Sequence, residues 1–100
     1  MFVDVTSHHI DRGKRLSPCF CPIALAVKDY LRLNDIKASY IQVSGVSMKI
    51  SIPPRLDDSY IMNRDVQAWL DQFDNKQEVD PITLFVDKYD NGNGDVSIWR

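Results

Sequence analysis

Two stretches of the chain carry apolar residues at the spacing of an α-helix, and shorter stretches with strand patterns surround them. In residues 22–33 the apolar sector consists of Ile23, Ala26, Val27, Tyr30 and Leu31. In residues 64–74 it consists of Val66, Trp69, Leu70 and Phe73. Side chains at i, i+3, i+4 and i+7 share one face of a helix, and an apolar face needs another element to cover it. Two amphipathic helices are therefore predicted.

Residues suited to helix ends flank both segments. Pro22 follows Cys21, and proline at the first helical position loses no hydrogen bond. Asn63 can cap the second helix, because its side chain can accept a hydrogen bond from the first turn. Asn34 and Asn75 are plausible ends. The helices are expected to start after Cys21 and Asn63.

The remaining segments predict strands and turns. Strand patterns cover residues 3–5, 36–43, 48–52, 82–86 and 96–99. Residues 6–11 suggest a short helical turn, which Gly13 would end at positive φ. Residues 55–62 appear polar and irregular, and residues 90–95 have the composition of a hairpin turn. The prediction is an α+β fold of βαββαβ-like order, with an antiparallel or mixed sheet of four to five strands and two main helices on one face.

Length and charge limit the class of protein. One hundred residues are expected to form a single domain, residues 1–100. The net charge is -2, and the only short basic cluster is Arg12, Lys14 and Arg15, which argues against general nucleic-acid binding. No apolar run approaches the roughly 20 residues that span a bilayer, and the first residues lack the pattern of a signal peptide. We expect a cytoplasmic protein that does not bind membranes.

The densest group of reactive side chains is His8, His9, Cys19 and Cys21. Two imidazoles and two thiols could surround a zinc ion, but one residue between the cysteines is shorter than the usual spacing of zinc ligands. Adjacent histidines also point in different directions. We expect one buried cysteine, one partly exposed cysteine and surface histidines, and no metal or other cofactor.

Cys21 could alternatively be a reactive thiolate. At a helix start, exposed N–H groups and the helix dipole would lower its pKa, with Lys14 or Arg15 adding to the effect. A nucleophile would also need a base, for which only His8 or His9 is available. The simpler interpretation is a thiol that fills a small buried space.

Carboxylates and one tryptophan are the candidates for partner binding. The candidate residues are Asp57, Asp58, Asp71, Asp74 and Trp99. The acidic run from Asp57 to Asp80 shows no paired general acid and base, and it could present an acidic patch to a basic partner. Trp99 either holds the last strand onto the domain or anchors a partner, and we expect it in the core.

Two groups of residues carry a resemblance to a known family. The first runs from Val5-Thr6 through His9-Ile10-Asp11 and Gly13 to the string Cys-Pro-Ile-Ala-Leu-Ala at residues 21–26. The second is the helix of residues 66–73, followed by Asp74, Val79, Pro81 and Phe85. Together they resemble a family of small phage and bacterial proteins without an assigned function. Cys19 and the tail after Val86 lie outside that pattern. The resemblance implies an accessory protein of a phage or mobile element, and it implies no activity and no site residues.

These observations favour a non-enzymatic accessory protein of a phage or mobile element that binds a host macromolecule. Such binding could inhibit a host protein or a defence protein. The expected partner is a protein or a second copy of the chain. One alternative is a thiol- or metal-dependent protein that uses His8, His9, Cys19 and Cys21. Another is a structural subunit that assembles through an exposed sheet edge.

Overall fold

The computed structural model describes residues 1–54, 57–89 and 92–99. It has an α+β fold, in agreement with the predicted class. The elements in chain order are β1 (Phe2–Val5), α1 (Ser7–Arg12), α2 (Pro22–Leu33), β2 (Tyr40–Val43), β3 (Ser47–Ser51), β4 (Asp58–Met62), α3 (Arg64–Asp74), β5 (Ile82–Lys88) and β6 (Asn93–Ile98).

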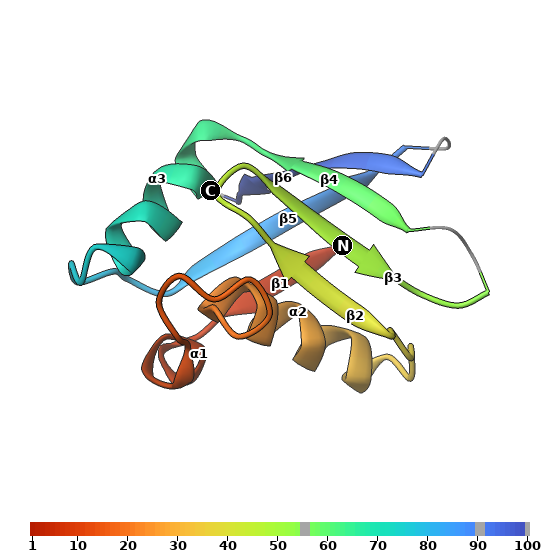
Figure 1. The fold of residues 1–100 in the computed structure, drawn as a ribbon, viewed down its shortest axis with the longest axis horizontal. Coiled ribbons are helices and arrows are strands. Elements are labelled where there is room, and N and C mark those ends of the chain that lie inside the picture. Colours follow the sequence, from red (N-terminus) through yellow and green to blue (C-terminus); the bar gives the residue numbers. More distant parts are fainter. Residues whose placement is uncertain (55–56, 90–91, 100) are drawn as a thin grey trace.

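The strands form one mixed sheet in the order β1-β5-β6-β4-β3-β2. The pair of β4 and β6 is parallel, and the other neighbouring pairs are antiparallel. The sheet curls so that β2 and β3 lie in front of β5 and β1, with α2 at the open side between the two edge strands (Figure 1). Helix α2 contacts both β1 and β2, and α3 contacts the inner strands β4 and β6.

The core lies between the inner face of the sheet and the two longer helices. Alternate strand residues point inward, as the two-residue period of a strand requires. Fully buried side chains include Ile23, Val27, Val66, Met48, Met62 and Leu84. Burial of the apolar sectors of α2 and α3 confirms the two predicted helical faces.

Both longer helices start at the predicted residues. The Cys21 sulfur accepts a hydrogen bond from the Ala24 N–H at 3.4 Å, and Pro22 occupies the first turn of α2. The Asn63 side chain accepts one from the Val66 N–H at 3.4 Å. These caps satisfy N–H groups that have no partner within the helix.

The sheet has six strands, more than the four to five that were predicted. The additional strand is β4, which lies in the segment that was expected to be irregular. Its inward residues are Asp58, Tyr60 and Met62, so an aspartate interrupts the apolar alternation. Lys88 Nζ lies 3.1 Å from the Asp58 carboxylate, and this ion pair allows the carboxylate to be buried. The predicted βαββαβ-like order therefore lacks β4. In the observed sheet, β1 and β2 occupy opposite edges.

Several boundaries also differ from the expectation. The strand predicted for residues 36–43 covers only Tyr40–Val43. The predicted hairpin exists between β5 and β6, but positions 90 and 91 of its turn lie outside the described residues. Gly13 has φ -66, so positive φ is not the reason for glycine there. A Cβ at Gly13 would lie 2.6 Å from the Pro22 ring, and close packing against the start of α2 explains the residue.

Candidate partner-binding surface

Three aromatic side chains lie together on the outer face of the sheet. Val3, Leu84 and Val96 point into the core, so the alternate positions on β1, β5 and β6 point outward. Phe2 and Phe85 are outward neighbours in the β1–β5 register. The N–H of Trp99 donates to the Thr83 carbonyl at 2.8 Å, which continues the β5–β6 pairing past the end of β6.

The three rings are in mutual contact. The Phe2 ring centroid lies 5.1 Å from that of Phe85 and 4.9 Å from that of Trp99, the latter in an edge-on arrangement. The Phe85 and Trp99 centroids are 6.0 Å apart. These spacings fall in the favourable range for aromatic pairs. Even so, 50% of Phe2 and 57% of Trp99 remain exposed, so the cluster is an ordered surface feature.

Carboxylates flank this aromatic cluster along the strands. Asp4 lies on one side, where it accepts a hydrogen bond from the Thr83 hydroxyl at 2.7 Å. Asp87 and Asp95 face each other on the other side in the β5–β6 register. No lysine or arginine occupies an outward position within β1, β5 or β6, every residue of which the structure describes. We call Phe2, Phe85, Trp99, Asp4, Asp87 and Asp95 the acidic aromatic face.

Tyr89 holds one of these carboxylates in place. Its hydroxyl donates a hydrogen bond to Asp95 Oδ2. This bond to the carboxylate raises the pKa of Tyr89, because ionisation of the phenol would remove the donated proton. The Asp95 side chain is therefore oriented before any partner arrives.

The prediction that Trp99 belongs to the core is wrong. Position 99 follows β6 at an outward position, and more than half of the Trp99 surface is exposed. The two other aromatic residues of the cluster were not singled out from the sequence. A signal existed in residues 82–86, because an apolar run without alternation indicates apolar residues on both faces of a strand.

The acidic residues singled out from the sequence do not form one patch. Asp58 is buried, so it cannot contact a partner. Asp57 precedes β4 and accepts a hydrogen bond from Tyr40, which lowers the pKa of that carboxylate. Asp71 and Asp74 belong to α3, which lies at the opposite end of β4 (Figure 1). Asp74 accepts a hydrogen bond from the Leu16 N–H at 3.0 Å.

The expectation of two surface histidines is wrong for His9, which is buried between α1 and α2. Its Nδ1 lies 3.0 Å from the Thr6 N–H, which must donate, so Nδ1 is the acceptor. The ring proton then lies on Nε2, which donates to Asp29 Oδ2 at 2.7 Å. Nδ1 thus links α1 to Thr6, the residue before the helix, and Nε2 links α1 to Asp29 of α2. His8, its neighbour, is exposed.

Cys21 is buried, with 2% of its surface exposed. Burial raises the pKa of its thiol, and this effect outweighs the backbone hydrogen bonds that lower it. The alternative of a thiolate activated by the helix start therefore finds no support, and the burial of Cys21 agrees with the simpler interpretation of a thiol that fills a small buried space. Cys19, the second cysteine, is half-buried.

The described residues contain no group of three or more His, Cys, Asp or Glu side chains placed to hold a metal ion. The four residues His8, His9, Cys19 and Cys21 all lie within the described ranges. The joint metal site considered from the sequence thus receives no support from their arrangement.

Comparison of this chain with protein-family models, with curated proteins and with solved structures found no match. In the ranges that the structure describes, no helix has both the length and the apolar character to cross a membrane.

Proposed function

We propose that this chain is a non-enzymatic binding protein whose acidic aromatic face docks onto a basic, partly apolar surface of a partner protein. The observation that carries the proposal is the contact cluster of Phe2, Phe85 and Trp99, in which Phe2 and Trp99 are about half-exposed and which three carboxylates flank. Aromatic residues, tryptophan above all, dominate the energetics of protein interfaces, and rigid rings lose little entropy on binding.

The charge of this face selects the kind of partner. These three carboxylates lie on β1, β5 and β6, whose described residues include no outward lysine or arginine, and they would attract lysine and arginine side chains and steer their approach. The same charges would repel the phosphates of a nucleic acid. A basic protein surface with an apolar centre is the partner that fits both features.

The resemblance to small phage and bacterial proteins supports a biological setting for this activity. In that setting the chain is an accessory protein of a phage or mobile element that acts in the host cytoplasm. Its docking would inhibit or redirect a host protein, for example one that takes part in defence.

The decisive measurement is the affinity of a partner for wild-type and Trp99→Ala protein. A partner isolated from host lysate with the wild-type chain is purified and titrated against each variant by calorimetry. Trp99→Ala is expected to raise Kd by about 30-fold or more, the effect of losing an interface hot spot. Because Trp99 is half-exposed, the thermal midpoint should change little.

A matched control is available on another surface. Leu33 is 79% exposed at the end of α2, a helix that contributes no residue to the acidic aromatic face. Leu33→Ala should leave Kd unchanged, and the triple change of Asp4, Asp87 and Asp95 to asparagine should weaken the dependence of Kd on salt. Equal affinities of wild type and Trp99→Ala, or an equal loss in Leu33→Ala, would contradict the proposal.

A further inference from the structure

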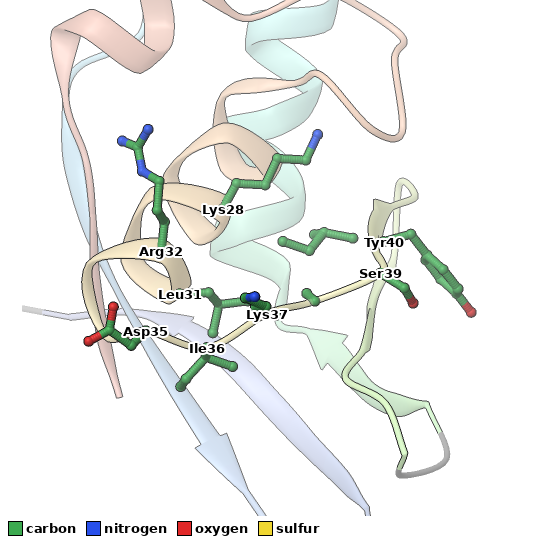
Figure 2. A pocket seen from close by; sticks show the side chains of 10 residues that line it. Lys28, Leu31, Arg32, Asp35, Ile36, Lys37, Ser39 and Tyr40 are labelled. Atoms are coloured by element: carbon green, nitrogen blue, oxygen red, sulfur yellow. The ribbon is translucent and has the colours of Figure 1, made fainter.

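A groove of about 600 Å³ lies between the second half of α2 and the start of β2. It is separate from the acidic aromatic face, which belongs to β1, β5 and β6. Figure 2 shows that side chains from α2, from residues 35–39 and from Tyr40 surround it. The floor is apolar and includes Leu31, Ile36 and Ile41. Ile36 is 38% exposed, so part of this apolar floor is accessible to a ligand.

The rim of the groove is mainly cationic. Lys28, Arg32 and Lys37 line it, and among the lining residues that the structure describes Asp35 is the one carboxylate. In Figure 2 the side chains of Lys28 and Arg32 rise from α2, and their charged ends diverge. The same two residues also border an adjoining hollow of about 410 Å³, to which Arg12 contributes another cation. Asp29 also lines this second hollow and pairs with Arg32, so the cations exceed the carboxylates around the two hollows without standing alone.

Three contacts fix the positions of two of the rim cations, Lys28 and Arg32. Lys28 Nζ donates to the Cys19 carbonyl at 2.6 Å and lies 4.4 Å from the centroid of the Phe20 ring. Arg32 Nη2 donates to Asp29 Oδ1 at 2.9 Å. These contacts reduce the side-chain entropy that a ligand would otherwise have to remove on binding.

The backbone of β2 supplies a further binding element. The N–H of Ser44 donates to the Ser47 carbonyl, so these two residues form a hydrogen-bonded pair at the end of the β2–β3 ladder. In an antiparallel ladder such pairs alternate with pairs whose backbone groups point away from the partner strand. Ile41 belongs to the second kind, so its N–H and C=O point away from β3, to the edge of the sheet. On the same edge, the Val43 N–H already binds the Pro18 carbonyl at 2.8 Å. The loop that contains Pro18 thus pairs with the backbone of Val43, and an extended ligand could pair with the backbone of Ile41 in the same way.

We propose that the groove between α2 and β2 binds an extended segment of a partner protein in which acidic and apolar side chains alternate. Apolar side chains on one face of such a segment would contact the exposed part of Ile36. Carboxylates on the opposite face would approach Lys28, Arg32 and Lys37, while the backbone pairs with Ile41. This recognition combines addition to a sheet edge with pockets for alternate side chains.

The test uses fluorescence anisotropy with a labelled peptide of about six residues that alternates glutamate and valine, roughly 20 Å long when extended. The full chain should bind it with saturation. A lysine–valine peptide of equal length should bind at least about tenfold more weakly, and so should a glutamate–serine peptide. A version N-methylated at alternate amides should lose affinity as well, because it cannot pair with a strand. This last comparison leaves the protein unaltered.

Two variants locate the peptide on the protein. Arg32→Glu combined with Lys37→Glu should raise Kd by at least about tenfold, whereas Lys76→Glu, on the loop after α3, should not. Trp99→Ala should bind the peptide like wild type, which separates this groove from the acidic aromatic face. Any of four results would overturn the proposal: no saturation at roughly millimolar peptide, equal binding of the lysine peptide, equal binding of a labelled oligothymidylate, or equal affinity of the double variant.

Discussion

At the scale of single residues, Cys21 shows how one side chain can satisfy a helix and the core together. Its sulfur accepts the Ala24 N–H at the start of α2, and its side chain is almost fully buried. A helix start lowers the pKa of a thiol only if the thiolate remains solvated or finds a cation. Burial removes that solvation, so the neutral thiol is favoured.

Thiol chemistry follows from this environment. In the native protein, Cys19 should react with an aromatic disulfide reagent before Cys21, and urea should make both thiols reactive. The raised folded-state pKa of Cys21 also means that its contribution to stability is present below its usual value of 9.0 and is lost as the pH rises above it.

In the wild type, the free energy of unfolding measured in urea should be lower at about pH 10 than at about pH 8. Cys21→Ser keeps a capping acceptor but has no thiol to titrate, so its stability should change less between the two pH values. Rapid modification of both cysteines in the native state, or the same pH dependence in the variant, would show that Cys21 is not buried as described.

At the scale of elements, the β5–β6 hairpin depends on the absence of a side chain at one position. A Cβ at Gly94 would lie 2.1 Å from the Asp87 carbonyl oxygen and 2.8 Å from the Tyr60 ring. The first contact is with backbone, which cannot move without disturbing the ladder between the strands. Gly94 therefore permits β5, β6 and β4 to approach one another.

Gly94→Ala should destabilise the protein by at least roughly 1–3 kcal/mol, as overpacking of a core does. Gly45, in the β2–β3 turn, provides the matched control, because a Cβ there would meet no atom within 4 Å. Gly45→Ala should change the free energy of unfolding by less than about 0.5 kcal/mol. Urea denaturation of the two variants measures both effects, and similar values would contradict the close packing at Gly94.

The helices and the strands differ in how well the sequence predicts them. α2 and α3 follow from apolar spacing and from caps within the same few residues. β4 escapes the same reasoning because Asp58 points inward, and its partner Lys88 is distant in sequence. The acidic aromatic face is equally hard to predict from the sequence, because Phe2, Phe85 and Trp99 become neighbours only through the pairing of β1, β5 and β6.

At the scale of the whole molecule, α2 links the two ends of the sheet. β1 and β2 occupy opposite edges, and α2 contacts both. Removal of apolar contacts from α2 should therefore loosen both edge strands, although they do not pair with each other. The curled sheet and α2 are expected to unfold as one cooperative unit.

Ile23→Ala tests this coupling, because Ile23 is fully buried in α2. The change should cost about 2–5 kcal/mol. Hydrogen exchange followed by mass spectrometry should show faster exchange in β1 and β2 together. Ile61→Ala, at an outward position that is 67% exposed, is the control and should alter neither strand. Faster exchange in one edge strand alone would show that α2 does not couple them.

Local chemistry determined the parts of this protein that depend on neighbours in sequence: the class of fold, the bounds of two helices, their caps and their buried faces. Tertiary structure alone decided the sixth strand, the burial of Asp58, the exposure of Trp99 and the groove between α2 and β2. The physical reason is the range of the interactions. A helix satisfies its hydrogen bonds within four residues, whereas a strand, a buried ion pair or a surface cluster depends on residues that folding brings together from distant parts of the chain.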